Sequence, residues 1–304
     1  MIEPGSVLWT PSPERIARAR ITEFRQWLTA QRGLTFDSFE ALWDWSTTDI
    51  DAFWQAIWDF SNIEATRAPT AVLGRRSMPG TEWFPGAEIN YARHMLRHER
   101  PNAVALLHLN ERQPLQEVSW EELGGKVRIV ATRLRELGVK RGDRVCAYMV
   151  NTPETLVAML ATTSLGAIWS SVGPDFGTPG VLDRFSQLEP VVFFHVDGYQ
   201  YGGRPFDRRP EVEKILERLT TVQHVIQLPY LDTANPRRLT PGTILWDELL
   251  DHAPVSRADF QYEEVPFDHP LWILFSSGTT GLPKPIMHSH GGILIEQLKH
   301  IAFN

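Results

Sequence analysis

The chain has 304 residues, of which 42% are hydrophobic and 22% are charged, and its formal net charge is −7. This composition is ordinary for a globular protein with a sizeable core, and the negative charge argues against a general nucleic-acid binder. The one cysteine, Cys146, excludes an intrachain disulfide framework. The first residues have neither the basic nor the apolar segment of a secretory signal, so we expect a reducing, cytoplasmic compartment.

The first hundred residues are rich in tryptophan, with seven of the eleven in the chain. The seven are Trp9, Trp27, Trp43, Trp45, Trp54, Trp58 and Trp83. Trp54 and Trp58 combine with Phe53 and Ile57 at the i, i+1, i+4, i+5 spacing of one helix face. We therefore expect a helical region whose tryptophans are buried by packing, and a carbohydrate-stacking surface is the alternative.

From about residue 101 the pattern changes to alternating strands and helices. Ser119 followed by Glu122 predicts a capped helix that ends before Gly138. Strands are expected over 103–109, 144–150, 167–172, 191–196 and 222–228, and helices over 119–137, 153–165, 180–188 and 211–219. Apolar strands that are each followed by a helix are typical of a parallel sheet covered on both faces, so the predicted class is α/β.

Residues 155–174 carry no charged side chain, which is a length that could cross a membrane. Local signals favour a helix and a strand instead. Thr152 can cap a helix, the proline after it suits the first helical turn, and Gly166 suits the helix end. We expect a helix over 153–165, a buried strand over 167–172, and no membrane span.

The stretch from 276 to 284 has an unusual composition. It contains four hydroxyl side chains, two glycines and one lysine, without an acid: Ser276, Ser277, Gly278, Thr279, Thr280, Gly281, Leu282, Pro283, Lys284. Glycines bring backbone N–H groups close to a ligand, while hydroxyls and a lysine add donors and positive charge, so we predict a phosphate-binding loop. A polar hairpin between two strands is the alternative. The prolines on either side of the lysine do not fit the Walker A loop, in which a Gly-Lys-Ser/Thr run opens a helix.

A second polar loop, 197–204, follows the apolar strand over 191–196. Ligands of such sheets gather beyond the carboxyl ends of the strands, where both loops are expected. Gly202 and Gly203 beside Arg204 could hold an anion, since a guanidinium matches phosphate oxygens. A solvated loop is an equally good interpretation of these three residues taken alone.

Two histidines, His288 and His290, follow the phosphate-binding loop and precede a helix expected over 293–300. On a strand, residues at i and i+2 point the same way, which would suit a metal. The sequence supplies no third ligand nearby, so structural roles are favoured and no metal site is assigned.

The motifs resemble those of a known family. The run from 276 to 284 is similar to the signature phosphate loop of the adenylate-forming enzymes, which include acyl-CoA synthetases, luciferases and nonribosomal peptide adenylation domains. Pro285 stands where that family usually has glycine. The run Trp43-Asp44-Trp45-Ser46 and residues 83–92 resemble the N-terminal extension of short-chain acyl-CoA synthetases. The sequences of these segments and of residues 288–294 are most similar to the acetoacetyl-CoA synthetase branch.

This resemblance implies an N-terminal extension over 1–100 and an AMP-binding domain over 101–304. It implies ligation in two steps, through an acyl-adenylate, with acetoacetate, ATP and CoA as substrates and Mg²⁺ as the accompanying ion; acetate or propionate are the alternative acids. It assigns the ATP phosphates to Ser276, Ser277, Gly278, Thr279, Thr280, Gly281 and Lys284. It assigns CoA to Gly202, Gly203 and Arg204, with Tyr201 in place of the family's first arginine.

The family continues beyond the equivalent of Asn304 with the rest of the sheet, the acyl and adenine pockets, and a small domain that carries a catalytic lysine. The resemblance thus predicts the N-terminal portion of a ligase, with no catalytic residue of its own and no turnover alone. A sheet divided at this point leaves apolar surface and a strand edge uncovered, which favours aggregation. A P-loop-like phosphotransferase, which would release ADP, and a non-catalytic remnant are the other two hypotheses. The sequence predicts no oligomeric state.

Overall fold

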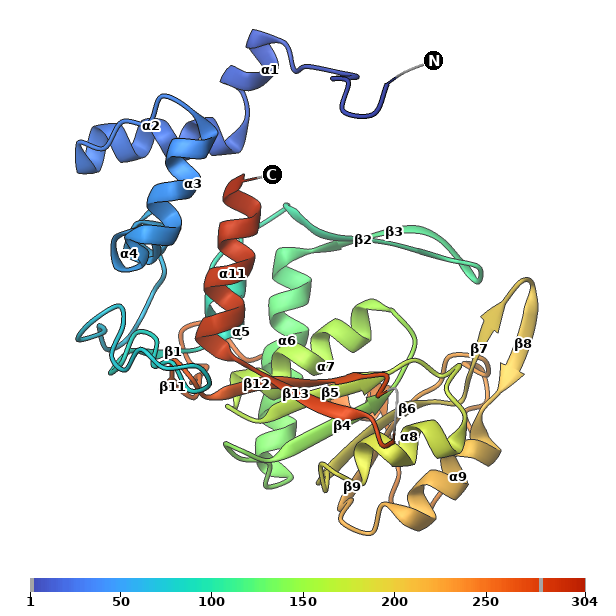
Figure 1. Ribbon diagram of the computed structural model, residues 1–304. Helices are drawn as coiled ribbons and strands as arrows, with labels where there is room; N and C mark the ends of the chain where they lie inside the picture. The colour runs from blue at the N-terminus through green and yellow to red at the C-terminus, as the bar shows by residue number, and fades with distance from the viewer. Residues whose placement is uncertain (1–2, 279–280, 304) are drawn as a thin grey trace. The chain divides into compact units, whose positions relative to one another are not determined.

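A computed structural model describes residues 3–278 and 281–303 of the chain (Figure 1). The chain forms two compact units. One comprises Met1–Ala87 together with Gly292–Asn304, and the other comprises Glu88–Gly291.

The first unit is helical, as predicted. Its elements are α1 (Pro13–Ala17), α2 (Arg20–Arg32), α3 (Phe39–Thr48), α4 (Ile50–Phe60) and most of α11 (His290–Phe303). Helix α3 begins at Ser38, whose Oγ accepts a hydrogen bond from the N–H of Ala41 at 3.1 Å, the usual satisfaction of a free helix N-terminus.

Aromatic rings form the core of this unit. Phe24 of α2 contacts Phe60 of α4 and Phe303 of α11, with ring centroids 5.1 and 5.3 Å apart. Trp58 stacks on Phe84 at 4.7 Å. Such pairs favour packing beyond the area that they bury. The packing interpretation therefore holds for the tryptophans of α4, whereas Trp9 and Trp43 are exposed.

The second unit is built on a seven-stranded sheet. Its strand order is β10-β9-β6-β4-β5-β12-β13, and only the β12–β13 pair is antiparallel. The strands are β4 (Arg144–Tyr148), β5 (Ile168–Val172), β6 (Val192–Val196), β9 (His224–Leu228), β10 (Ile244–Leu245), β12 (Pro270–Ser276) and β13 (Lys284–Ser289). All five residues of β6 are buried, as expected for a strand in the middle of a covered parallel sheet.

Helices cover both faces of this sheet (Figure 1), which confirms the predicted α/β class. They are α5 (Tyr91–Leu96), α6 (Trp120–Glu136), α7 (Pro153–Ser164), α8 (Thr178–Phe185), α9 (Arg209–Arg218) and α10 (Trp246–Leu250). Phe185 of α8 and Ile215 of α9 pack in one core cluster with Cys146 and Phe193 of the sheet. Burial raises the pKa of the Cys146 thiol well above its ordinary value, so the thiol is a core group.

Three two-stranded pairs stand outside the main sheet. They are β1 (Glu88–Ile89) with β11 (Val265–Pro266), β2 (Val104–Asn110) with β3 (Gln113–Ser119), and β7 (Gly198–Tyr201) with β8 (Arg204–Asp207). The expectation that the strand over 103–109 joins the parallel sheet was therefore wrong. Its apolar residues Leu107 and Leu109 are exposed, because β2 pairs only with the polar strand β3.

The uncharged stretch 155–174 divides between α7 and β5, as predicted. Gly166 follows the end of α7 with a φ of +64°, a backbone conformation that favours glycine. Thr152 occupies the N-cap of α7, although its side chain makes no capping hydrogen bond. No helix in the described part of the chain is long and apolar enough to span a membrane.

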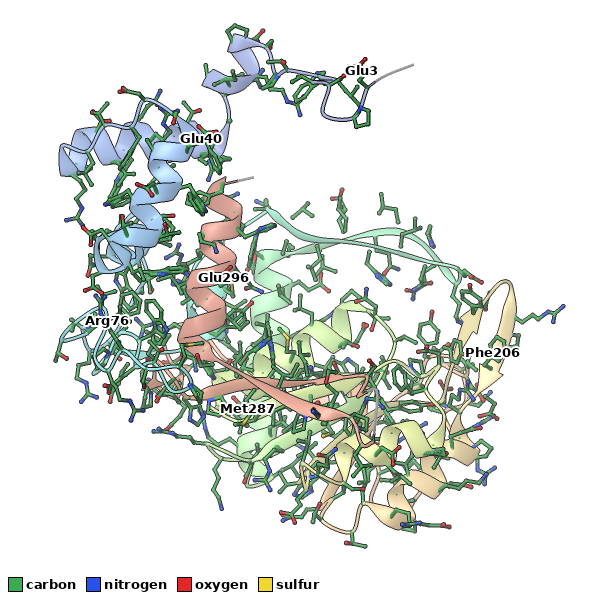
Figure 2. The ribbon with its side chains drawn as sticks, in the orientation of Figure 1. Glu3, Glu40, Arg76, Phe206, Met287 and Glu296 are labelled. Carbon is green, nitrogen blue, oxygen red and sulfur yellow. The ribbon has the colours of Figure 1, made fainter. Side chains whose placement is uncertain are left out.

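Strand β12 continues the sheet toward one edge. Trp272 is paired with Trp169 of β5 in the parallel ladder, and beside this pair Ser170 Oγ donates to the carbonyl of Ile273 at 2.8 Å. On its other side β12 pairs with β13 along its length. Met287 of β13 is 66% exposed on this outer strand (Figure 2).

A buried asparagine joins three segments of the second unit. Asn90 is the N-cap of α5, and its Oδ1 accepts from the N–H of Arg93 at 3.0 Å. Its Nδ2 donates to the carbonyls of Thr163, Ser164 and Glu263 at 3.0, 3.3 and 2.9 Å. One amide group thus satisfies the end of α7 and the chain leading to β11.

We predict that Asn90→Asp lowers the free energy of unfolding by about 3 kcal/mol, because a carboxylate would face three carbonyl oxygens without donors. Urea unfolding followed by circular dichroism measures the change. Asn102→Asp, on the exposed surface, is the control and should cost less than about 0.5 kcal/mol. Equal costs for the two variants would contradict the role of Asn90.

Candidate functional site

The order of the strands reverses at β4. The chain passes from β4 to β5 on one side, and then crosses to β6 on the other side of β4. In open parallel sheets, ligands bind in the crevice that such a reversal opens at the carboxyl ends of the strands. The second unit therefore has a defined place for a ligand before any side chain is considered.

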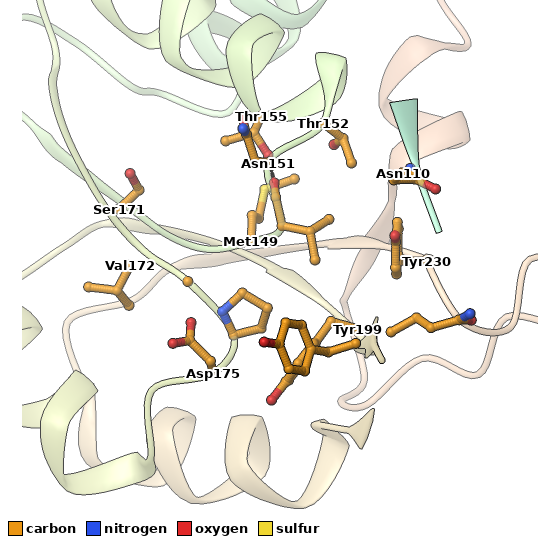
Figure 3. A pocket seen from close by; sticks show the side chains of 15 residues that line it. Asn110, Met149, Asn151, Thr152, Thr155, Ser171, Val172, Asp175, Tyr199 and Tyr230 are labelled. Carbon is orange, nitrogen blue, oxygen red and sulfur yellow. Dashed lines mark hydrogen bonds between the residues drawn. The ribbon is translucent and has the colours of Figure 1, made fainter. Parts of the chain in front are cut away.

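A cleft of about 810 Å³ lies at this place (Figure 3). Its walls come from the residues that follow β4 and β5 and from the region of β7. They are Met149, Val150, Asn151 and Thr152 after β4, Thr155 of α7, Ser171 to Asp175 at the end of β5, Tyr199, Gln200 and Tyr201 of β7, and Asn110 and Tyr230. Three tyrosines and a proline give flat apolar surface beside hydroxyl and amide groups, which suits an aromatic, polar ligand.

Tyr148, the last residue of β4, holds the loop after β5 that lines the cleft. Its hydroxyl lies 2.8 Å from the carbonyl oxygen of Pro174 and 2.7 Å from that of Phe176. Burial raises the pKa of Tyr148 to about 12, so the hydroxyl keeps its proton and holds the loop after β5 as a donor.

Thr152 lines the cleft and has a buried hydroxyl without a partner in the described part of the chain. The residue is only 8% exposed, and its Oγ1 has no hydrogen-bond partner among the described residues. It stands at the N-terminus of the twelve-residue helix α7, where partial positive charge favours an oxygen ligand.

A buried aspartate positions the wall that carries Tyr230. Asp197, 3% exposed, follows β6 directly. Its Oδ1 accepts from the N–H groups of Tyr230 and Leu231, and its Oδ2 accepts from that of Asp232, each at 2.8 Å. Three charge-assisted hydrogen bonds hold the loop after β9 against the end of β6.

The predicted anion loop after β6 is a hairpin rather than an irregular loop. Gly202 and Gly203 form its turn with φ of +58° and +74°, as in the type I′ turns that glycine favours. Arg204 begins β8 and is exposed. Both glycine N–H groups point to one acceptor: Gly202 donates to Oε1 of Glu111 at 2.9 Å and Gly203 donates to Oε2 at 2.8 Å.

Glu111 lies at the turn of the β2–β3 hairpin. The N–H groups of Gly203 and Gly202 lower the pKa of its carboxyl below the ordinary value. The sequence prediction missed this residue, although the Asn-Glu-Arg turn between two strand-like runs is a signal for a hairpin.

The predicted phosphate-binding loop connects β12 to β13. Ser276 ends β12 and faces Lys284, which begins β13. Gly278 has a φ of +52°, and a Cβ there would approach the carbonyl oxygen of Leu282 to 2.9 Å, so the turn needs glycine. The hairpin interpretation and the ligand-binding interpretation are thus compatible. Ser277 and Gly281 lie in the turn, whereas Thr279 and Thr280 lie outside the described residues.

Lys284 is exposed beside the loop. Because directly paired residues of an antiparallel pair share one face, its side chain lies on the face of Ser276. The loop is held from α8 and the turn after it: Gln187 Nε2 donates to the carbonyl of Pro283 at 3.0 Å, and the guanidinium of Arg184 lies 6.0 Å from the ring of Phe275.

The two histidines after the loop have separate structural roles. His288 lies on β13 and its Nδ1 accepts from Trp272 Nε1 at 3.0 Å. His290 begins α11 and its Nδ1 accepts from the N–H of Tyr91 at 3.2 Å. The two do not share one strand face, and no group of three potential metal ligands occurs in the described part of the chain.

The predicted phosphate-binding loop and the β7–β8 hairpin both lie at the carboxyl edge of the sheet, and strand β7 of the hairpin lines the cleft. Strands β6 and β12 are three places apart in the order β6-β4-β5-β12, which is about 14 Å. The cleft lies between them at β4 and β5. The edge can therefore serve two parts of an extended ligand, or two ligands.

Comparison with known proteins agrees with this architecture. The family described as AMP-binding enzyme matches residues 95–303, and the chain belongs to that family. A second family, described as acetyl-coenzyme A synthetase N-terminus, matches residues 39–95.

The chain is similar to acetoacetyl-CoA synthetases. It is 38% identical over 301 residues to that of Macaca fascicularis, covering 96% of this chain and 44% of that protein. It is 38% identical over 298 residues to that of Rhizobium meliloti, covering 98% and 45%. The structure of the Streptomyces lividans enzyme matches with a TM-score of 0.92 and 46% identity over 97% of this chain and 45% of that one. The chain thus spans about half the length of the relatives that it matches.

We predict that Asp197→Asn lowers the free energy of unfolding by about 2–3 kcal/mol, because an amide NH₂ would oppose one of the three N–H donors. Urea unfolding measures this change, and Asp251→Asn on the exposed surface is the matched control. A cost no larger than that of the control would show that Asp197 does not hold the cleft wall.

Proposed function

We propose that this chain supplies the ATP-phosphate site and a CoA-binding surface of an acid–thiol ligase that makes acetoacetyl-CoA, AMP and pyrophosphate. The observation that carries the proposal is the Ser- and Gly-rich turn at the carboxyl edge of the sheet, with Lys284 opposite Ser276. The relatives named acetoacetyl-CoA synthetase support acetoacetate as the acid. Acetate and propionate remain the alternative substrates.

The chemistry places an anionic carboxylate near an anionic triphosphate. In the first step the carboxylate oxygen attacks the α-phosphorus and pyrophosphate leaves; in the second, the CoA thiol displaces AMP. Donors fixed before the reaction lower the repulsion without reorganising. We assign this role to Ser276, Ser277, Gly278, Gly281 and Lys284, together with Thr279 and Thr280 from the sequence. These groups bind and position phosphate, and none of them transfers a proton.

Mg²⁺ is proposed to enter with ATP. No set of three His, Cys, Asp or Glu side chains in the described part of the chain could hold it, so no residue here is assigned as its ligand. CoA is proposed to contact Gly202, Gly203 and Arg204, and its flat nucleotide end suits the tyrosine-lined cleft beside them. The buried single thiol of Cys146 accords with a reducing cytoplasm.

We predict that Lys284→Ala weakens the binding of ATP in the presence of Mg²⁺ about threefold to tenfold, because one charge-assisted contact to phosphate is lost. Isothermal titration calorimetry on the purified chain measures the affinity. Lys214→Ala on α9 removes the same charge from an exposed position far along the chain and is the control. Equal affinities for the two variants would contradict the assignment of Lys284.

The reaction is tested by product analysis with ATP, CoA and each acid. Release of AMP supports the ligase, whereas release of ADP would identify a phosphotransferase. We propose that turnover also needs the part of the relatives that this chain does not match. Acetoacetate-dependent AMP release by the purified 304-residue chain alone would contradict that division.

A further inference from the structure

The tips of two hairpins meet beside the cleft. The β2–β3 tip brings Glu111 and Arg112 to the β7–β8 tip and to the loop after β9 (Figure 1). Asn110 shapes the first tip, because its Oδ1 accepts from the N–H groups of Arg112 at 2.7 Å and of Gln113 at 2.9 Å. The turn therefore presents the Glu111 carboxylate outward in a defined place.

The contact between the tips consists of two kinds of interaction. The carboxylate of Glu111 takes both N–H groups of the Gly202–Gly203 turn. The guanidinium of Arg112 donates to the carbonyl of Leu231 at 3.0 Å and lies 5.5 Å from the centroid of the Tyr230 ring. Asn110 and Tyr201, the neighbours of Glu111 and Gly202 in the sequence, line the cleft, as does Tyr230. We therefore name the contact of Glu111 with Gly202 and Gly203 the cleft clasp.

Two adjacent glycine N–H groups that point to one centre form an anion-binding concavity. The clasp shows that this concavity accepts a carboxylate with normal hydrogen-bond lengths. A phosphate oxygen, like a carboxylate oxygen, is a negatively charged acceptor that binds to well-aligned N–H donors. Glu111 thus occupies the position that an external anion would need.

The clasp is exposed to solvent on the Glu111 side, so its interaction is weak and exchangeable. This differs from Asp197, which makes the same type of contact in a buried position. An exposed carboxylate can be displaced by a ligand that brings more charge to the same donors, whereas a buried one cannot leave without a large penalty.

We propose that Glu111 is a competing internal anion at the Gly202–Gly203 turn, and that a phosphate-bearing ligand binds there by displacing Glu111 and releasing the β2–β3 tip from the mouth of the cleft. Glu111 then sets the affinity and the anion selectivity of the site. The identification of that ligand as CoA rests on the proposed function, whereas the competition itself rests on the clasp.

The test compares Glu111→Gln with the wild-type chain, using adenosine 3′,5′-bisphosphate as a fragment of CoA. Removal of the competing charge should tighten binding about twofold to fivefold, the range expected for an exposed charge interaction. Glu117→Gln on β3 makes the same change in net charge on the same hairpin and should leave the affinity unchanged. If the bisphosphate binds the wild-type chain, and binds Glu111→Gln equally or more weakly, the clasp is only a structural tie and the inference is overturned.

A second measurement separates this inference from the proposed function. In ¹H–¹⁵N spectra, the Gly202 and Gly203 amides should shift on addition of inorganic phosphate, at lower concentration in Glu111→Gln than in the wild type. If this holds while adenosine 3′,5′-bisphosphate fails to bind either protein, the CoA assignment is wrong and the anion competition stands. If the two amides respond to phosphate in neither protein, the inference fails whatever else the chain binds.

Discussion

The pairing of β4 with β5 on one side and β6 on the other is the constraint on which the rest of the second unit depends. Five residues of β4 pair with β5 and four pair with β6, all in parallel register. Because helices cover both faces, this ladder lies in a dry interior where its hydrogen bonds have no water to replace them. The two strands that follow β4 in the chain, β5 and β6, therefore lie on opposite sides of it. The cleft lies at the carboxyl end of β4, where the connections to these strands diverge.

Much of this architecture was predictable from the sequence, and the confirmed parts share one property. The strands over 144–150, 167–172 and 191–196 are continuous apolar runs, each followed by a helix signal, so burial alone defines them. The helical structure of the tryptophan-rich N-terminal region is also confirmed, because the spacing of its aromatic residues matches one buried helix face. Strand β3 escaped prediction because its residues are mostly exposed, and two-residue strands such as β10 exist only through their partners.

The candidate site divides in a similar way. The composition of the loop from 276 to 284 predicts a ligand-binding loop, and both this role and its assignment to ATP stay predictions. The cleft could not be predicted, since it depends on residues that are distant in the chain: Asp197 holds Tyr230, and the tip of the β2–β3 hairpin contacts Gly202. Such contacts follow from the crossings of the sheet, which local patterns do not encode.

Helix α8 contacts both the cleft region and the predicted phosphate-binding loop, which the strand order alone does not show. It begins just after the loop whose carbonyls, at Pro174 and Phe176, lie against the Tyr148 hydroxyl. Arg184, near its end, lies 4.8 Å from the ring of Phe176 and also near Phe275, and Gln187 just beyond the helix binds the exit of the phosphate loop. Helix α8 and the residue Gln187 after it thus contact both the loop after β5 and the end of the 276–284 loop. The loops after β5 and β12, which are neighbouring strands about 4.8 Å apart, therefore share their contacts with one helix.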